Sequence, residues 1–143
     1  LFWFRLFYVY GPGQRPGSLI PTLASAFKSG GSPSLRTPDA ANDFVHVRDA
    51  AEAFRLALKR GAVPGAYNIG CGKAVPLRNV CRLIERELTG NDQFCQQLPT
   101  RGRTSPSNFW ADITKAQRGL GWRPRVPLED GIRNYLKACD EKT

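Results

Sequence analysis

Hydrophobic residues at the start of the chain form one nearly continuous run. Residues 1–10, LFWFRLFYVY, contain a single charge, on Arg5. This pattern is typical of a strand that is covered on both faces in a parallel sheet, because neither face alternates with polar residues. The run therefore predicts a buried strand over residues 1–10.

Four later stretches have apolar residues three or four positions apart, which predicts an amphipathic helix in each. Gly30, Gly61 and Gly90 lie just beyond three of these stretches, where helices commonly end. Asp49 is placed to cap the second helix. The apolar stripes are Leu19, Ile20, Leu23, Ala24 and Phe27; Ala50, Ala53, Phe54, Ala57 and Leu58; Leu77, Val80, Cys81, Ile84 and Leu88; and Leu128, Ile132, Tyr135, Leu136 and Cys139. A short fifth helix is expected over residues 113–119.

Short apolar segments between the helices predict further strands. They are DFVHV at 43–47, AYNIG at 66–70 and Phe94–Gln97, and the polar loop 32–42 has room for one more at 34–36. Because strands alternate with helices, the predicted fold class is α/β. A chain of 143 residues is long enough to bury a core, and one domain is expected.

The net charge of +9 is compatible with nucleic-acid affinity, with attraction for an anionic small molecule or with a solvated basic surface. The basic residues are scattered, which argues against a basic tail. No apolar run reaches the roughly 18 residues that span a bilayer. Residues 1–10 are too short and too aromatic for a signal peptide, so we expect no membrane partner and a cytoplasmic location.

Metal and disulfide chemistry is not expected from the cysteines and the histidine. Cys71, Cys81, Cys95 and Cys139 form no C-x-x-C pair, and His46 is the only histidine, so a zinc site is not predicted. Without secretory signals, free thiols are favoured over disulfides. For His46 in the middle of a strand, a packed side chain is favoured over a role in proton transfer.

Gly11, Gly13 and Gly17 lie between a strand and a helix, where open α/β folds bind phosphate. A dinucleotide fingerprint requires G-x-G-x-x-G. Here the spacing is G-x-G-x-x-x-G, and Pro12 and Pro16 remove two N–H donors. A plain strand-to-helix turn is therefore favoured. The second Gly-x-Gly, in YNIGCG, is also interpreted as a structural turn and not as a phosphate cradle.

Four segments resemble consecutive signature segments of the extended short-chain dehydrogenases/reductases, the NAD-dependent sugar-nucleotide epimerases and dehydratases. They are RLFYVYGPGQ, NDFVHVRDAAEA, AYNIGCG and WADITKAQRGLGWRPRVPLEDGI, and they cover nearly all of residues 4–136 in the family's order and spacing. The resemblance implies that residues 1–143 are a single C-terminal fragment of a Rossmann-type enzyme, with the last sheet strands and the mixed α/β substrate-binding subdomain.

The family's dinucleotide-binding glycines and its catalytic Tyr-x-x-x-Lys pair precede the strand at which this chain begins. No Y-x-x-x-K occurs in the 143 residues. The resemblance therefore places no catalytic residue in this chain, and the chain is expected to be inactive alone.

The resemblance places Leu6 and Phe7 at the edge of the nicotinamide of NAD or NADP and Tyr8 toward the sugar. The implied substrate is a nucleoside-diphosphate sugar, and the implied full-length enzyme is a homodimer. Many relatives have Asn in place of Tyr8, so the sugar contacts must differ. The alternative is that Leu6, Phe7 and Tyr8 are core residues.

Further substrate contacts are implied at the first helix and in the loop that follows it. Ser18 and Leu19 match positions that contact the nucleotide sugar, although Ser18 is also an ordinary N-cap. Ser34 and Arg36 match a segment that flanks the base, and the alternative for Arg36 is an exposed loop arginine.

Asn42 stands where many relatives bind the diphosphate with an arginine, and Phe44 stands where Tyr is common. Losing the guanidinium removes a bidentate charged contact, so another basic residue must supply the charge. Arg36, Arg101 and Arg103 are the candidates. Arg101 and Arg103 lie on either side of the place from which similar enzymes extend an arginine to the diphosphate.

The alternative function is a non-catalytic relative that uses its basic surface as an RNA-binding module. RNA binding by a sheet requires solvent-facing aromatic residues interleaved with basic ones. The aromatic residues concentrate in residues 1–10, which are predicted to be buried, so a nucleic-acid partner is not expected. The sugar, the base and the choice among epimerase, dehydratase and reductase stay open.

Overall fold

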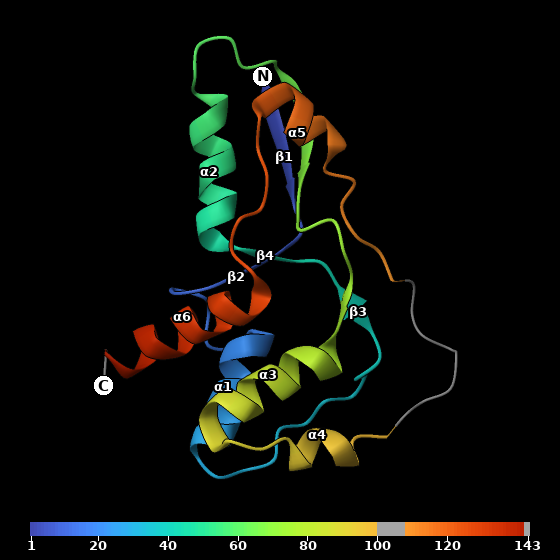
Figure 1. The fold of residues 1–143 in the computed structure, drawn as a ribbon, viewed down its shortest axis with the longest axis vertical. Helices are drawn as coiled ribbons and strands as arrows, with labels where there is room; N and C mark the ends of the chain where they lie inside the picture. Colours follow the sequence, from blue (N-terminus) through green and yellow to red (C-terminus); the bar gives the residue numbers. More distant parts are fainter. Residues whose placement is uncertain (100–107, 142–143) are drawn as a thin grey trace.

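The computed structural model describes residues 1–99 and 108–141 and has the predicted α/β class. The strands are β1 (Phe2–Leu6), β2 (Tyr8–Tyr10), β3 (Ala41–Asn42), β4 (Phe44–His46), β5 (Gly65–Ile69) and β6 (Val75–Pro76). The helices are α1 (Leu19–Lys28), α2 (Val47–Ala57), α3 (Leu77–Thr89), α4 (Gln93–Gln97), α5 (Thr114–Leu120) and α6 (Leu128–Asp140). Figure 1 shows β1 and β5 flanked by α2 and α5, with α1, α3, α4 and α6 gathered at the other end.

The strand predicted over residues 1–10 is divided into β1 and β2, because the chain changes its pairing partner at Phe7. β1 pairs in parallel with β5, and β2 pairs in parallel with β4. The backbone N–H of Phe7 donates to the carbonyl of Ile69 at 3.0 Å, and the N–H of Tyr8 donates to the carbonyl of Asp43 at 2.9 Å. Phe7 is therefore the residue at which the chain leaves one ladder and joins the other.

The prediction that both faces of this run are covered is wrong for β1. Trp3 and Arg5 share one face of the strand and are exposed, Trp3 by 62%. On the opposite face, the ring centroids of Phe2 and Phe4 lie 6.3 and 6.2 Å from that of Tyr67, and Leu6 at the end of this face is 46% exposed. The face of Trp3 is therefore open to solvent, and the face of Phe2 and Phe4 is packed.

Two hydrophobic cores meet at β4, because neighbouring strand residues point to opposite faces. Phe44 is 2% exposed and belongs to the core built mainly from α1, α3 and α6. Val45 is fully buried and belongs to the core built mainly from α2, β5 and α5. β4 thus joins the two halves of the molecule (Figure 1), and it pairs with β2, with Phe44 opposite Tyr8.

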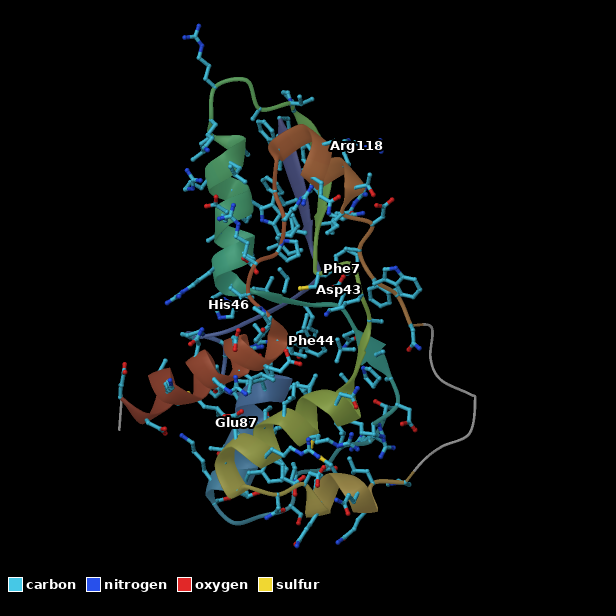
Figure 2. All side chains as sticks on the ribbon, in the orientation of Figure 1. Phe7, Asp43, Phe44, His46, Glu87 and Arg118 are labelled. Carbon is cyan, nitrogen blue, oxygen red and sulfur yellow. The ribbon has the colours of Figure 1, made fainter. Side chains whose placement is uncertain are left out.

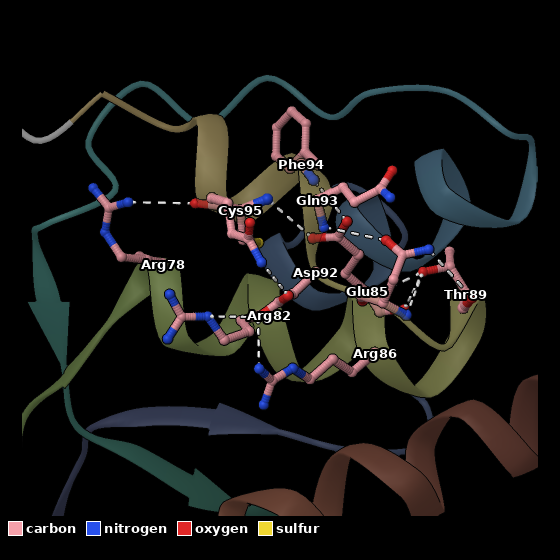
Figure 3. Close-up of polar contacts among 11 residues, drawn as sticks. Arg78, Arg82, Glu85, Arg86, Thr89, Asp92, Gln93, Phe94 and Cys95 are labelled. Carbon is pink, nitrogen blue, oxygen red and sulfur yellow. Dashed lines mark hydrogen bonds and ion pairs between the residues drawn. The ribbon is translucent and has the colours of Figure 1, made fainter.

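The strand predicted at Phe94–Gln97 is wrong, since these residues belong to the short helix α4. Glu85 of α3 is 3% exposed, and its carboxylate accepts the N–H groups of Phe94 at 2.8 Å and Cys95 at 3.0 Å (Figure 3). N–H groups in the first turn of a helix have no partner within the helix, so a carboxylate there stabilises the helix. The short strand expected at 34–36 is also wrong, since strand β3 lies at Ala41–Asn42.

Helix α2 begins at Val47, and the predicted cap at Asp49 is wrong. His46 is the N-cap, and its Nδ1 accepts the N–H of Arg48 at 3.3 Å. The buried Asp49 carboxylate instead accepts the N–H groups of Arg125 and Val126 at 3.0 and 2.9 Å. Asp49 therefore fixes the segment that leads into α6.

The predicted apolar stripe of α2 is only partly buried. Ala50 and Ala53 are buried, whereas Phe54 and Leu58 are 46% and 88% exposed. Helices α1, α3 and α6 lie where the apolar spacing predicts them, and α5 lies at the short helix expected over residues 113–119. Gly90 ends α3 in the left-handed conformation with φ 75°. As predicted, Cys71, Cys81, Cys95 and Cys139 form no disulfide in the structure. Within the described residues, no helix combines the length and the apolar character needed to cross a membrane.

Candidate functional site

A pocket of about 250 Å³ lies where β1 and β5 end and the chain changes partner. It is lined by Leu6, Phe7, Tyr8, Asn42, Asp43 and Phe109. Leu6 and Ile69 are paired at the carboxyl ends of the two parallel strands. Ligands of open α/β sheets bind beyond the carboxyl ends of the strands, where neighbouring strands diverge. The fold therefore makes this pocket the candidate ligand site, and Figure 2 labels two of its lining residues, Phe7 and Asp43.

The pocket brings together four residues that the sequence singled out. Leu6, Phe7 and Tyr8 come from one continuous segment, and Asn42 comes from the end of β3. β3 is held antiparallel to β6, with Asn42 opposite Val75. The β1–β5 ladder holds Leu6 and the β3–β6 ladder holds Asn42, so two short ladders bring the predicted cofactor and sugar residues to the same pocket.

Phe44 lies deeper than these residues. Its ring centroid lies 4.8 Å from that of Tyr8 and 6.3 Å from that of Tyr10. It also lines a second pocket of about 250 Å³, together with Cys71, Lys73 and residues 124–128. The ring of Phe44 packs against the ring of Tyr8, but Phe44 does not line the pocket at Phe7.

The other predicted contacts do not line the pocket at Phe7. Ser18 is the N-cap of α1, but its side chain makes no capping hydrogen bond. Leu19 is partly buried against the core that contains Phe44. Ser34 and Arg36 are exposed in the loop before β3. Arg101 and Arg103 lie outside the described residues.

Phe109 is a pocket residue that the sequence analysis missed. Its ring lies 5.9 Å from that of Phe7 at an interplanar angle of 52°. On one side of it, Asn108 Oδ1 accepts the N–H of Ala41 at 3.2 Å, and on the other the N–H of Ala111 donates to Asp43 at 2.9 Å. The only signal in the sequence was its place directly before the recognised segment WAD.

Asp43 is the second residue that was missed, and it is 1% exposed. Its carboxylate accepts the N–H groups of Cys71 at 2.5 Å, Gly72 at 2.9 Å and Ala111 at 2.9 Å. A Cβ added to Gly70 would lie 2.6 Å from Asp43 Oδ2. These donors of the YNIGCG turn are therefore bound to an internal carboxylate, which confirms that the turn is structural.

Two further groups near the site are held in their neutral forms. Burial, followed by the charges of Asp43 and Asp49, raises the pKa of the Cys71 thiol to about 11. Burial also lowers the pKa of the His46 imidazole, which is 1% exposed. Among the described residues His46 Nε2 has no hydrogen-bond partner, and a Cβ on Gly11 would lie 3.1 Å from it. His46 is packed, as the favoured interpretation predicts.

Across residues 1–99 and 108–141, no three His, Cys, Asp or Glu side chains gather closely enough to hold a metal ion.

The comparison with protein families matches residues 1–70 to the NAD dependent epimerase/dehydratase family. One curated relative is the dTDP-6-deoxy-L-talose 4-dehydrogenase (NAD(P)(+)) of Kitasatospora kifunensis, which is 32% identical over 142 residues. Another is the dTDP-4-dehydro-6-deoxyglucose reductase of Escherichia coli, which is 29% identical over 139 residues. Both alignments cover 94% of this chain but only 44% and 43% of the relatives, so the chain spans less than half of their length.

Solved structures show the same fold. MoeE5 in complex with UDP-glucuronic acid and NAD is 31% identical, with a TM-score of 0.80, over 98% of this chain and 47% of that protein. The UDP-glucose 4-epimerase of Thermotoga maritima with UDP-glucose is 27% identical, with a TM-score of 0.79, over 97% of this chain and 45% of that protein.

Proposed function

The chain belongs to the extended short-chain dehydrogenases/reductases of the NAD-dependent epimerase/dehydratase family, and from this we propose that it is the substrate-binding portion of a nucleotide-sugar epimerase, dehydratase or reductase. The observation that carries the proposal is the pocket at Phe7, which gathers the residues assigned to cofactor and sugar at the ends of parallel strands. In this proposal residues 1–143 act as one unit of a cytoplasmic, homodimeric enzyme.

The apolar side of the pocket fits a nicotinamide ring. Leu6 and Phe7 present hydrocarbon and aromatic surface, and Leu6 is 46% exposed, so it can lose water when a ring covers it. NAD or NADP would supply the hydride chemistry of the reaction. The contribution of Leu6 and Phe7 is to pack one edge of the ring and to exclude water from it.

The polar side of the pocket fits a sugar. Tyr8 offers a hydroxyl that can donate and accept, and Asn42 offers an amide with both kinds of group. A protein usually orients a small ligand with a small number of polar groups placed within an apolar pocket. We assign sugar hydroxyls to Tyr8 and Asn42, and we assign Phe44 to the support of the Tyr8 ring.

The nucleoside diphosphate is assigned to groups around this pocket. Ser18 and Leu19 lie at the start of α1, where N–H groups and the helix dipole favour an anion. Ser34 and Arg36 are exposed and accessible to a base or a phosphate. Because Asn42 carries no charge, we assign the largest share of the diphosphate charge to Arg101 and Arg103.

A calorimetric titration of the purified protein with UDP, CDP, GDP and dTDP tests this function. We expect one or more of them to bind, and we expect Arg101→Ala or Arg103→Ala to weaken that binding about tenfold to a hundredfold. This range corresponds to roughly 1.5–3 kcal/mol for one charge-assisted hydrogen bond. The exposed Lys59→Ala is the control for a general loss of positive charge.

Several outcomes would count against this proposal. Failure of every nucleotide to bind would reject nucleotide-sugar binding. If both loop variants bind like Lys59→Ala, the diphosphate assignment is wrong. Turnover of a nucleotide sugar by the 143 residues alone would reject the proposed inactivity, which rests on the absence of Tyr-x-x-x-Lys.

One observation favours the alternative of RNA binding. Trp3 and Arg5 are two positions apart on β1 and both exposed, so an aromatic and a basic side chain share an open face. The expectation that the aromatic residues of residues 1–10 are buried is wrong for Trp3. Titration with a single-stranded RNA oligonucleotide separates the alternatives, because an RNA-binding module would bind it more tightly than any mononucleotide.

A further inference from the structure

We propose that the pocket at Phe7 selects an uncharged sugar ring and that Phe109 is the specificity-determining residue that packs against it. This inference rests on the proposed function and adds a substrate class to it. Nucleotide sugars whose sugar is a neutral hexose or deoxyhexose fit the pocket, and hexuronic acids do not.

The first step is that Phe109 is held in place from both sides. Asn108 is bound to the backbone of Ala41, directly before the pocket residue Asn42. Ala111 is bound to the carboxylate of Asp43, which also lines the pocket. Because both anchors attach to the walls of the pocket itself, the ring of Phe109 has a defined position over it.

The second step is that two rings form one apolar wall. The ring centroids of Phe7 and Phe109 lie 5.9 Å apart, and the angle between the ring planes is 52°. Leu6 lines the same pocket and extends the apolar surface. Phe109 is 60% exposed, so a ligand that covers it removes apolar area from water. The face of a sugar ring that carries C–H groups is the part of the ligand that gains from this contact, and a methyl group in place of a C6 hydroxyl gains more.

The third step is electrostatic. Of the described residues that line the pocket, Asp43 alone is charged, and its charge is negative. Its carboxylate already accepts three backbone N–H groups, and it is 1% exposed. A second carboxylate, at C6 of a hexuronic acid, would lose water here beside a like charge, and no described residue that lines the pocket is a cation. A neutral hydroxyl or methyl at C6 carries neither cost.

Paired ligands that differ only at C6 test the selection. Glucose and glucuronic acid esters of UDP, dTDP, CDP and GDP are titrated into the purified protein, with each nucleoside diphosphate alone as reference. We expect each glucose ester that binds to do so at least tenfold more tightly than the glucuronic acid ester of the same nucleotide.

Variants of Phe109 test the wall. We expect Phe109→Ala to weaken binding of the glucose ester about tenfold while binding of the nucleoside diphosphate alone stays unchanged. Phe109→Tyr keeps the ring and should bind like the parent. Phe54→Ala is the matched control. Phe54 lies on α2, away from the pocket, and is 46% exposed. Its ring centroid lies 4.6 Å from that of Phe4, so it is also an exposed ring in contact with a second ring.

The outcomes separate this inference from the function on which it rests. If nucleotides bind but the glucuronic acid ester binds as tightly as the glucose ester, selection for a neutral ring is wrong and nucleotide-sugar binding stands. If Phe109→Ala weakens binding of the nucleoside diphosphate alone as much as binding of the glucose ester, Phe109 does not pack against the sugar. If no nucleotide or ester binds, the proposed function fails and this inference fails with it.

Discussion

Asp43 and Asp49 show how two single residues hold distant segments of this chain together. Asp43 binds N–H groups 28, 29 and 68 residues away, and Asp49 binds N–H groups 76 and 77 residues away. Both side chains are buried, where a hydrogen bond to a carboxylate is strong and an unpaired carboxylate is costly. Asp43 shapes the pocket at Phe7, while Asp49 sets the entry into α6.

His46 makes stability depend on pH. Burial lowers the pKa of its imidazole below the ordinary value of about 6.5. The unfolded chain therefore binds a proton at a higher pH than the folded chain does, so the contribution to stability is complete above pH ~6.5 and is lost as the pH falls through it. We expect the free energy of unfolding, measured by urea denaturation, to decrease from pH 7.5 to pH 5.5.

The His46→Asn variant identifies the source of this dependence. Asn is a good N-cap residue and does not titrate. The free energy of unfolding of the variant should therefore change less between pH 7.5 and pH 5.5 than that of the parent, whatever its overall stability. Because the chain has one histidine, its proton resonances report the pKa directly. Parallel pH profiles for parent and variant, or a measured pKa above 6.5, would contradict the prediction.

At the scale of single elements, α4 depends on a contact from another helix. It spans only Gln93–Gln97, and a helix this short is marginal in isolation. Glu85 binds two of its first N–H groups, while Arg82 and Arg86 bind Asp92 at 3.4 and 2.6 Å (Figure 3). The helix thus exists because α3 supplies partners for its N-terminus.

Replacing Glu85 by Gln should destabilise the protein by about 1.5–3 kcal/mol. The amide NH2 of Gln would face one of the two N–H donors that the carboxylate now accepts, and the charge would be lost. The free energy of unfolding from chemical denaturation measures the effect.

Glu87→Gln is the matched control, because Glu87 is an exposed residue of the same helix (Figure 2). Its carboxylate pairs with the guanidinium of Arg133 at 2.8 Å. An exposed pair of this kind contributes up to about 1 kcal/mol. Equal losses for the two variants would show that the buried carboxylate does not stabilise α4 in the way described.

At the scale of the whole molecule, strand β1 exposes apolar side chains. Trp3 and Leu6 on this strand are 62% and 46% exposed, and in the described structure β1 pairs only with β5. An unpaired strand edge beside exposed apolar side chains is a site of association. We expect the purified protein to associate as its concentration rises, and sedimentation velocity measures this.

A charged residue on the strand should oppose the association. Trp3→Lys is expected to raise the dissociation constant at least tenfold, because lysine on an edge strand blocks pairing. Trp110→Lys is the control, since Trp110 is similarly exposed at 57% but lies outside β1. A monodisperse monomer at high concentration would contradict the prediction.

Much of the architecture is determined by local sequence. Helices α1, α3 and α6 are predicted correctly, because the spacing of apolar residues and the Gly after α3 act within a few residues. Four of the pocket residues, Leu6, Phe7, Tyr8 and Asn42, were also singled out, because they lie in segments that resemble the family's signatures. Whether these residues bind cofactor and sugar stays a prediction.

Only the tertiary structure decided where the chain changes partner and what completes the pocket. The break at Phe7 depends on carbonyls of Ile69 and Asp43, and the position of Phe109 depends on contacts with Ala41 and Asp43. Each contact joins residues dozens of positions apart, so no local pattern contains it. A strand shows its hydrophobicity in sequence, but its pairing partners and the exposure of its faces exist only once the chain has folded.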